Sequence, residues 1–361
     1  MGRKDIEKIL REDFPKIKGK ELWIFGAGNT AALYYNGLLR LEKEGFLIQG
    51  YIDNDRNKWN HLFNGKKVVS LNSLLNEKEK VCILICSIQK KVVDSIKKQL
   101  SVEGFNDFYH IDEVIFKLHA DKVLQVYDLF ADEDSKNIYE VLLRERMACS
   151  GTTLPVDIHE QYFALPPFMI ENGREVFVDC GTYVGDTIER YLWNRSGVFN
   201  KIIGFEPDEK SLLALQHRIK RLKLEWGLRE SSIEIYHKGI ADKSLSGRVI
   251  RYSANNGLGS KIDSVEEGTE GFIVALDEFV HEPYSFLKAD IESWEYKMLV
   301  GATKGIKEYK PLLAICIYHN AVDFYEIPLL IHSFVPEYKL AVRHHSYTLA
   351  DSVLYAWLSN D

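Results

Sequence analysis

A glycine-rich segment in the second half of the chain has the residue types of a cofactor-binding loop. Residues 179–187, DCGTYVGDT, place Asp179 at the end of an apolar run and then Gly181 and Gly185 four positions apart. This D-x-G-x-x-x-G spacing differs from the G-x-G-x-x-G of loops that bind a pyrophosphate. The loop therefore suits a ligand without a pyrophosphate, with the acid facing a cationic or amine group.

Two later strand ends add groups that could hold an adenosine. Glu206 lies 21 positions after Gly185, ends the run KIIGFE and is followed by Pro207-Asp208. A carboxylate at this position can accept hydrogen bonds from both hydroxyls of a ribose. Another run ends at Ala241-Asp242, where small apolar groups can flank an adenine and Asp242 can bond its amino group.

Further polar residues end the apolar runs that come later in the chain. Asp290 and Glu292 end the run SFLKAD, and His319 ends PLLAICIY. A last run, YKLAV, ends in Arg343, His344 and His345. Ligands of a doubly wound sheet lie outside the carboxyl ends of its strands, so we expect these side chains at one rim.

A second glycine loop lies near the beginning of the sequence. Residues 26–31, GAGNTA, follow an apolar run and precede a helical pattern, as a G-x-G-x-x-A dinucleotide fingerprint requires. Asp53 ends the next strand, 25 positions after Gly28, where an acid can hold ribose hydroxyls. We therefore predict a nucleotide site at Gly26, Gly28, Asn29 and Asp53. Alternatively, the glycines serve only a tight turn and Asp53-Asn54-Asp55 is ordinary turn chemistry.

The elements that must position these groups alternate between strands and helices. In the first ~110 residues, hydrophobic periodicity predicts strands over 21–28, 46–55, 66–70 and 81–88 and helices over 30–43 and 89–100. This rhythm favours a parallel sheet. Helical spacing over 123–130 and 135–148, followed by a proline-containing stretch without a clear period, predicts a connector.

A second alternation begins near residue 175 and continues almost to the end. We expect a doubly wound, mostly parallel α/β sheet that finishes with an antiparallel hairpin of 338–345 and 351–358. The predicted organisation is a Rossmann-like α/β domain over 1–111, a helical connector over 112–170 and a larger domain over 171–361.

Composition narrows the class of protein. The 361 residues include 46 Lys and Arg against 53 Asp and Glu, a net charge of −7, which argues against a nucleic-acid-binding chain. No apolar run approaches the ~20 residues of a transmembrane helix. The opening MGRKDIEKIL lacks the apolar segment of a secretory signal. Four of the five cysteines lie in apolar runs, as buried reduced thiols do, so we expect a cytoplasmic protein.

Several ordered motifs carry a family resemblance. FVDCGTYVGDT, IIGFEPD, LKADIESWEYKMLVGA and LLAICIYH resemble, in this order, the FkbM-type S-adenosylmethionine-dependent methyltransferases. The upstream QYFALP and DLFADEDSKNIYEVLLRERM resemble the stretch before the catalytic domain in some members, so the likeness covers about 125–361. The family usually has glycine after its D-x-E pair, whereas Ser293-Trp294 follows here, which suggests a narrower pocket.

The resemblance implies a class I methyltransferase domain that binds S-adenosylmethionine. The expected cofactor residues are Asp179, Gly181, Tyr183, Gly185, Asp186, Thr187, Glu206, Asp208, Ala241 and Asp242. It also implies methyl transfer to a hydroxyl oxygen of a saccharide or related metabolite. The first ~110 residues resemble small nucleotide-binding domains of sugar-modifying bacterial enzymes, which favours a glycan acceptor and a nucleotide or nucleotide-sugar partner.

Methyl transfer needs an aligned acceptor and a group that takes its proton. His319 is the expected general base, although a half-buried histidine bonded to backbone would look the same. Asp290 could orient the acceptor hydroxyl or balance the sulfonium charge, while Glu292 could serve only as the acid at a helix start. Asp290, Glu292 and His319 would also suit a hard divalent metal, which sequence cannot demonstrate.

Substrate contacts are expected from residues near the same rim. Arg343 could bind an anionic group, and one of His344 and His345 could reach the site while the other packs. Tyr183, Trp294 and Tyr318 suit stacking on a sugar or adenine, or simple core packing.

Two other classes of function stay open at this point. The first glycine loop could serve an NAD(P)-dependent oxidoreductase or a nucleotide-sugar-modifying enzyme, although no Tyr-x-x-x-Lys pair follows within 1–111. Alternatively, both loops could be ligand sensors without catalysis.

Overall fold

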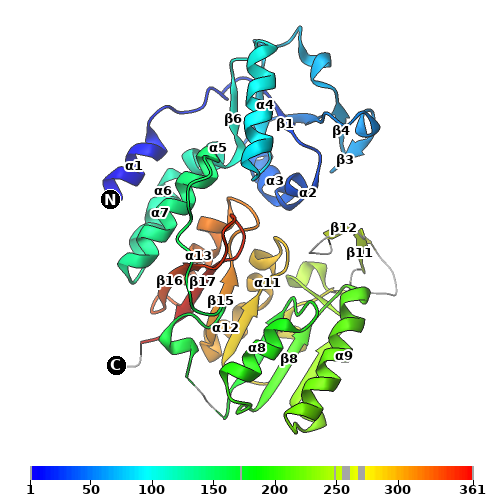
Figure 1. Cartoon of the computed structure of the whole chain (residues 1–361), viewed down its shortest axis with the longest axis vertical. Coiled ribbons are helices and arrows are strands. Elements are labelled where there is room, and N and C mark those ends of the chain that lie inside the picture. Colours follow the sequence, from blue (N-terminus) through cyan, green and yellow to red (C-terminus); the bar gives the residue numbers. More distant parts are fainter. Residues whose placement is uncertain (1, 171–172, 248, 254–260, 267–272, 360–361) are drawn as a thin grey trace. The chain divides into compact units, whose positions relative to one another are not determined.

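The computed structural model describes residues 2–170, 173–247, 249–253, 261–266 and 273–359 (Figure 1). The chain divides into two compact units. Unit 1 contains residues 1–156, 318–326 and 346–350, and unit 2 contains residues 157–317, 327–345 and 351–361. Each unit has its own parallel sheet, so the α/β class predicted for both halves is confirmed.

Unit 1 is built on a six-stranded sheet with the order β3-β4-β2-β1-β5-β6. Its strands are β1 (Glu21–Phe25), β2 (Ile48–Ile52), β3 (Leu62–Phe63), β4 (Lys66–Val69), β5 (Val81–Ile85) and β6 (Phe108–His110). All neighbours are parallel except β3 and β4. Every residue of β5 is buried, as expected for a central parallel strand with both faces covered.

The helices of unit 1 flank this sheet and extend into the connector region. They are α1 (Arg3–Arg11), α2 (Asn29–Leu33), α3 (Tyr35–Lys43), α4 (Lys90–Val102), α5 (Ile111–Leu118), α6 (Ala120–Leu129) and α7 (Glu133–Ala148). Helix α4 forms because Val93, Ile96 and Leu100 recur at helical spacing and bury one face. The single helix expected over 30–43 is two helices that meet at Tyr34.

A distant piece of sequence, 318–326, completes unit 1. The buried guanidinium of Arg146 donates to the carbonyl oxygen of Tyr318 at 2.9 Å. The same guanidinium donates to the Asp112 carboxylate at 2.8 Å and to the Tyr34 hydroxyl at 2.7 Å. Because both charges are buried and fully hydrogen-bonded, this network fixes the segment firmly within unit 1.

Unit 2 is built on a seven-stranded sheet with the order β16-β17-β15-β14-β7-β8-β9. Its strands are β7 (Val176–Cys180), β8 (Lys201–Phe205), β9 (Ile233–Tyr236), β14 (Phe286–Ala289), β15 (Leu312–Cys316), β16 (Lys339–His344) and β17 (Ser352–Trp357). The five strands from β9 to β15 are parallel, and β17 pairs antiparallel with both β15 and β16. The predicted terminal hairpin is therefore confirmed.

The remaining elements of unit 2 cover this sheet or form small additions to it. The helices are α8 (Asp186–Asn194), α9 (Glu209–Glu225), α10 (Leu276–Phe279), α11 (Glu295–Gly301), α12 (Thr303–Tyr309) and α13 (Asp323–Phe334), the last of which begins within segment 318–326. The small strands are β10 (Gly239–Ile240), β11 (Val249–Ser253), β12 (Lys261–Glu266) and β13 (Ile273–Val274). The run that ends at Ala241-Asp242 forms two strands rather than one, since β10 does not continue β9 but pairs with β13.

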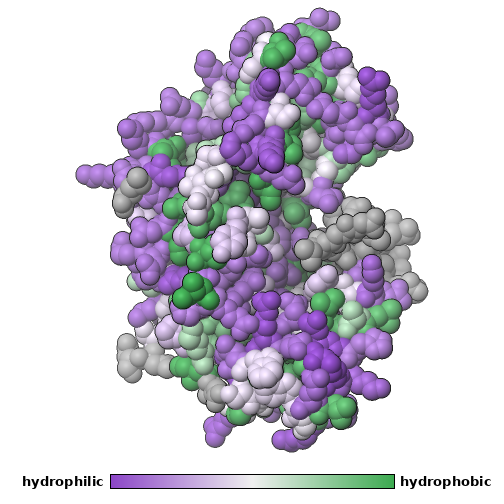
Figure 2. Space-filling view, viewed as in Figure 1, coloured by the Kyte–Doolittle hydropathy of each residue, from purple (hydrophilic) through white to green (hydrophobic). Residues whose placement is uncertain are grey.

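The surface of the protein is ordinary for a globular chain. Figure 2 shows mostly hydrophilic side chains on the face in view, with hydrophobic residues in small groups. All five cysteines are free and buried, as predicted for four of them. Within the described ranges, no helix has the length and apolar character that crossing a membrane requires.

Candidate active site

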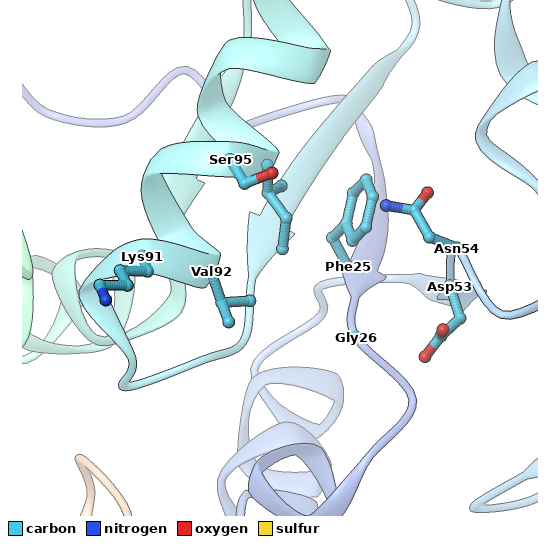
Figure 3. Close-up of a pocket in the computed structure, with 8 residues that line it drawn as sticks. Phe25, Gly26, Asp53, Asn54, Lys91, Val92 and Ser95 are labelled. Carbon is cyan, nitrogen blue, oxygen red and sulfur yellow. The ribbon is translucent and has the colours of Figure 1, made fainter.

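The glycine loop of unit 1 joins β1 to α2 and is tied to the next strand. Gly26 adopts a φ of +113°, and a Cβ there would lie 3.0 Å from the Cys86 carbonyl oxygen, so this turn needs glycine. The Asp53 carboxylate accepts a hydrogen bond from the Ala27 N–H at 2.9 Å and forms an ion pair with the Lys58 ammonium at 2.9 Å. The structure thus brings Gly26 and Asp53 together, and both line a cavity of about 350 Å³ (Figure 3).

The electrostatics of Asp53 follow from these contacts. Burial opposes ionisation, but hydrogen bonds from the Asp55 N–H, the Lys58 ammonium and the Ala27 N–H lower the pKa of Asp53. Three donors of its own chain occupy most of the roughly four lone-pair positions of a carboxylate. Asn29, which was also predicted for this nucleotide site, is the first residue of α2.

The glycine loop of unit 2 joins β7 to α8 and packs closely on β14. Gly181 has a φ of +80°, and a Cβ there would lie 2.0 Å from the Asp290 carbonyl oxygen. Gly185 has a φ of +82°, and its Cβ would meet the Leu215 side chain at 2.7 Å. Both positions therefore need glycine, and the close approach at Gly181 brings the predicted cofactor loop against the predicted catalytic strand end.

Glu206 binds the backbone of this loop. Its carboxylate accepts the Tyr183 N–H at 2.7 Å and the Asp208 N–H at 2.8 Å. Only 6% of the residue is exposed, and burial raises the pKa of Glu206 to about 7 in spite of these two hydrogen bonds. A ligand that donates further hydrogen bonds would stabilise the charged carboxylate, which is what ribose hydroxyls do.

A buried ion pair lies beneath the loop. Asp179 and Lys288 are register partners on β7 and β14, and the Lys288 ammonium lies 2.9 Å from Asp179 Oδ1 and 2.8 Å from the Gly181 carbonyl oxygen. Burial raises the pKa of Asp179 to about 6, although Lys288 opposes the shift. Burial disfavours the Lys288 ammonium too, but Asp179 and Asp290 raise its pKa. Sequence reasoning missed Lys288, although a lone lysine in an apolar strand signals a buried partner.

Asp290 is held in place by a tyrosine that sequence reasoning also missed. The Tyr162 hydroxyl donates to Asp290 Oδ2 at 2.8 Å, and its ring lies 5.1 Å from the Lys288 ammonium. Tyr162 adopts a φ of +72°, a strained conformation for a bulky residue, and its N–H donates to the Tyr355 hydroxyl at 3.0 Å. Such strain marks a residue that its surroundings fix in one position.

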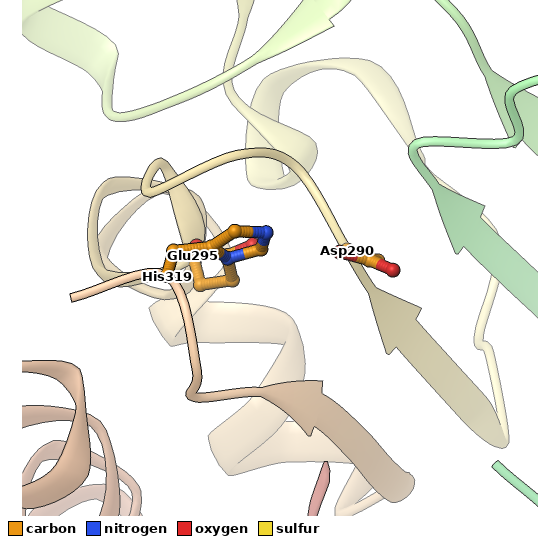
Figure 4. A group of neighbouring side chains, drawn as sticks. All are labelled: Asp290, Glu295 and His319. Carbon is orange, nitrogen blue, oxygen red and sulfur yellow. The ribbon is translucent and has the colours of Figure 1, made fainter. Parts of the chain in front are cut away.

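A fully buried carboxylate, that of Glu295, accompanies the half-buried Asp290. Glu295 begins α11, is fully buried and accepts the Ile291 N–H at 2.7 Å. Carboxylate oxygens of Asp290 and Glu295 lie within 4.8 Å of each other. Figure 4 draws Asp290 at the end of β14 and Glu295 at the start of α11, with His319 on the segment after β15. Carboxylate oxygens are ligands that hard divalent cations prefer. The metal hypothesis from the sequence named Glu292 rather than Glu295 beside Asp290 and His319, and it stays a prediction.

The turn between these two acids departs from the family pattern. Glu292 and Ser293 both have positive φ values, +54° and +72°, so Ser293 adopts the left-handed backbone that a glycine would supply. Trp294 follows and packs on a small cluster formed by Ala241 and Ile273. The structure therefore brings the expected substrate residue Trp294 beside the expected adenine contact Ala241.

Other expected cofactor residues have structural roles. Asp208 caps α9 by accepting the Ser211 N–H at 2.8 Å, and Asp242 accepts the Ser244 N–H at 2.9 Å. Asp186 begins α8, and Thr187 is buried in its first turn.

The residues at the end of β16 make contacts within unit 2. The Arg343 guanidinium lies 3.4 Å from the Asp157 carboxylate. His344 is fully buried, with Nδ1 2.8 Å from the Ser352 hydroxyl. His345 Nε2 lies 3.1 Å from the Tyr355 hydroxyl, and burial lowers the pKa of His345 to about 4. His319, expected at the end of β15, belongs to segment 318–326 of unit 1.

Several solved structures resemble this chain to different degrees. Methyltransferase FkbM from Methylobacillus flagellatus KT matches with a TM-score of 0.56 and 17% identity, over 98% of this chain and 98% of that one. An rRNA methylase from Streptococcus thermophilus matches with a TM-score of 0.34 and 14% identity, over 56% and 99% of the two chains. An SAH-bound methyltransferase from Podospora anserina matches with a TM-score of 0.30 and 9% identity, over 64% and 97%.

The strand order of unit 2, its glycine loop and the first of these likenesses define a class I methyltransferase fold. The family model described as "Methyltransferase FkbM domain" matches residues 179–344, so this part of the chain is similar to the FkbM methyltransferases. A second family model, "C2185-like, N-terminal", matches residues 19–111. No curated protein matches the chain. The resemblance stated from the sequence motifs is confirmed.

Proposed function

We propose that the protein transfers a methyl group from S-adenosylmethionine to a hydroxyl oxygen of a saccharide or related small metabolite. The observation that carries the proposal is the Glu206 carboxylate, hydrogen-bonded to the Tyr183 N–H within the FkbM-type domain. Glu206 follows directly after β8, where an acid can accept hydrogen bonds from the hydroxyls of an adenosine ribose. When bound, S-adenosylmethionine would supply an electrophilic methyl group.

Asp179 supports the same donor. Its carboxylate is fully buried, and Oδ2 has no hydrogen-bond donor among the described residues. A buried carboxylate oxygen without a donor is costly, so a ligand that brings an N–H group would find a partner there. The amino group of a methionine moiety has this chemistry.

For the acceptor, we propose that Asp290 takes the hydrogen bond of the reacting hydroxyl. Tyr162 fixes the Asp290 carboxylate at 2.8 Å, so it is held ready to align an incoming O–H group. Trp294 would stack on a sugar face, since its ring is only partly buried. Glu292 stays a proposed catalytic residue, and Arg343, His344 and His345 stay proposed substrate contacts.

His319 stays the proposed general base on the basis of its place in the chain. It follows Cys316, the last residue of β15, by three residues. Three residues span at most about 11 Å, so the covalent chain keeps His319 near the carboxyl end of that strand. An imidazole there could accept a proton near neutral pH. We place the reaction in the cytoplasm, in keeping with five free thiols.

Calorimetry and a product assay test the proposal together. We expect the full chain to bind S-adenosylmethionine, and to release S-adenosylhomocysteine only when a hydroxylated acceptor from a saccharide panel is present. Binding without turnover over the whole panel would favour a sensor over an enzyme. Absence of binding would refute the proposed donor.

A further inference from the structure

A cavity in unit 1 is lined by residues that have no part in the proposed methyl transfer. One wall consists of the first turns of α4, with Lys91, Val92, Ser95 and Ile96, as Figure 3 shows. The opposite wall is formed by the ends of β1 and β2 and consists of Phe25, Gly26, Asp53 and Asn54. Its volume, about 350 Å³, lies at the lower end of the range of small-molecule sites.

The sheet topology explains why a cavity exists here. From β1 the chain passes to β2 on one side and later returns to β5 on the other, so the strand order reverses between β1 and β5. At such a switch point the connections leave in opposite directions and open a crevice outside the carboxyl ends of the strands. The cavity lies between the β1 and β2 ends and the helix that follows β5, where this rule places ligands.

Gly28 adds an independent indication of a ligand. Unlike Gly26, it has no positive φ, and a Cβ built on it would meet no atom within 4 Å. Nothing in the described part of the chain therefore requires glycine at this position. In the G-x-G fingerprint, the second glycine lets a phosphate approach the backbone. A bound phosphate, rather than the packing of the protein, would therefore require glycine at this position.

The polar groups narrow the chemistry of that ligand. Asp53 already accepts three hydrogen bonds from its own chain, so it is poorly placed to hold the ribose of a dinucleotide. Asn54 is bonded through both amide atoms to Gln99. Lys91 is exposed, and the structure records no ion pair for it among the residues described, so its ammonium can meet an anion. Val92 and the Phe25 ring offer apolar surface for a flat ring.

We infer that unit 1 binds a mononucleotide, a nucleoside mono- or diphosphate, with its phosphate at the Gly26–Gly28 loop and Lys91 and its base between α4 and the end of β1. This site is separate from the methyl-donor site of unit 2, since every residue that lines the cavity belongs to unit 1. A dinucleotide held through Asp53, as in an NAD(P)-dependent oxidoreductase, does not follow from these contacts.

Calorimetric titration of the full chain with AMP, UMP, ADP and UDP tests the inference. S-adenosylhomocysteine is kept at a saturating concentration during the titration, so that adenosine nucleotides cannot bind at the proposed methyl-donor site of unit 2. We expect at least one nucleotide to bind at one per chain with a Kd below ~100 μM. Gly28→Ala should weaken this binding at least tenfold without changing the urea midpoint, and Lys91→Glu should weaken it similarly.

Lys98→Glu is the matched control, because it reverses an exposed charge on the same helix outside the cavity. It should bind the nucleotide as the wild type does. The inference is overturned if none of the four nucleotides binds at 1 mM, if Gly28→Ala and Lys91→Glu both bind normally, or if NADH binds more tightly in a fluorescence titration. Binding of S-adenosylmethionine to the same variants reports the methyltransferase site separately, so the two proposals can fail independently.

Discussion

The two glycine loops of this protein follow one plan but differ in how the acid of the neighbouring strand is charged. In unit 1, Asp53 accepts a loop N–H and lies 2.9 Å from the Lys58 ammonium, and its pKa is lowered. In unit 2, Glu206 accepts a loop N–H in the same way, but no ion pair is recorded for it within the described residues, and burial raises its pKa to about 7.

This difference separates an acid that holds a loop from an acid that is prepared for a ligand. Asp53 accepts three hydrogen bonds from its own chain, so its carboxylate stays charged without a ligand. Glu206 carries its charge at a cost that ribose hydroxyls would offset, and such a cost is common at functional sites. If Glu206 binds the methyl donor as we propose, the same position in the two loops has two different uses.

The largest effect is expected when the lysine beneath the second loop is removed. Lys288→Met leaves the buried Asp179 carboxylate unpaired, which costs about 3–5 kcal/mol of unfolding free energy. Lys58→Met, its counterpart in unit 1, should cost less than about 1 kcal/mol, because the Lys58 side chain is 39% exposed. Urea unfolding of the full chain measures both. Equal losses would show that the two loops are supported alike.

Alanine at one glycine of each loop should separate the loops by their packing. Gly181→Ala forces a Cβ against the Asp290 carbonyl oxygen at positive φ, so we expect a loss of about 3 kcal/mol and of donor binding. Gly28→Ala meets open space and should change stability by less than about 0.5 kcal/mol. A stable Gly181→Ala protein with unchanged donor affinity would contradict the described packing.

The acids themselves should differ in their effect on donor binding. Glu206→Gln removes a charged acceptor, so we expect the affinity for S-adenosylmethionine to fall about 10- to 100-fold. Asp53→Asn is the matched control and should leave that affinity unchanged. Calorimetry with both variants decides the point, and a similar loss in both would mean that the donor site is not where we propose it.

A further effect is expected on the pH dependence of stability. A carboxyl group whose folded-state pKa is raised binds more protons in the folded protein, so stability falls as pH rises toward that pKa. Glu206, with a pKa of about 7, and Asp179, with about 6, should therefore lower the stability of unit 2 between pH 5 and 7.5. Each pKa unit corresponds to on the order of 1 kcal/mol.

Two variants test this sign without added ligand. Glu206→Gln should reduce the decrease in urea midpoint between pH 5 and 7.5. Asp53→Asn should not alter it, because the lowered pKa of Asp53 affects stability only below about pH 4. A steeper decrease in Glu206→Gln would show that Glu206 is ionised more easily than its burial suggests.

Local patterns in the sequence were sufficient to predict the strands that carry the two glycine loops. Apolar runs that end in glycine or an acid predicted β1, β7 and β8, and the structure places Glu206 on the loop N–H of Tyr183. These features lie within one strand-loop-helix unit or between sequential strands, where chain connectivity limits the arrangements. The antiparallel hairpin was predictable for the same reason.

Long-range pairings were not predictable in this way. Lys288 meets Asp179 only because β14 lies beside β7 in one particular register, 109 positions apart in the sequence. Tyr162 reaches Asp290 from an irregular stretch that has no periodicity, and it does so through a left-handed backbone that propensity disfavours. Segment 318–326 contains no pattern that assigns it to unit 1, since its contacts come from residues far away in the sequence, such as Arg146 and Tyr139.

That last segment has a consequence for how the chain is made. Unit 1 needs residues 318–326 and 346–350, which leave the ribosome after nearly all of unit 2. Domains usually fold in the order of their synthesis, but here the unit that begins first is completed only after most of the other unit has been made. Until residue 318 is synthesised, the buried guanidinium of Arg146 lacks the Tyr318 carbonyl, so nascent unit 1 stays incomplete while most of unit 2 is translated.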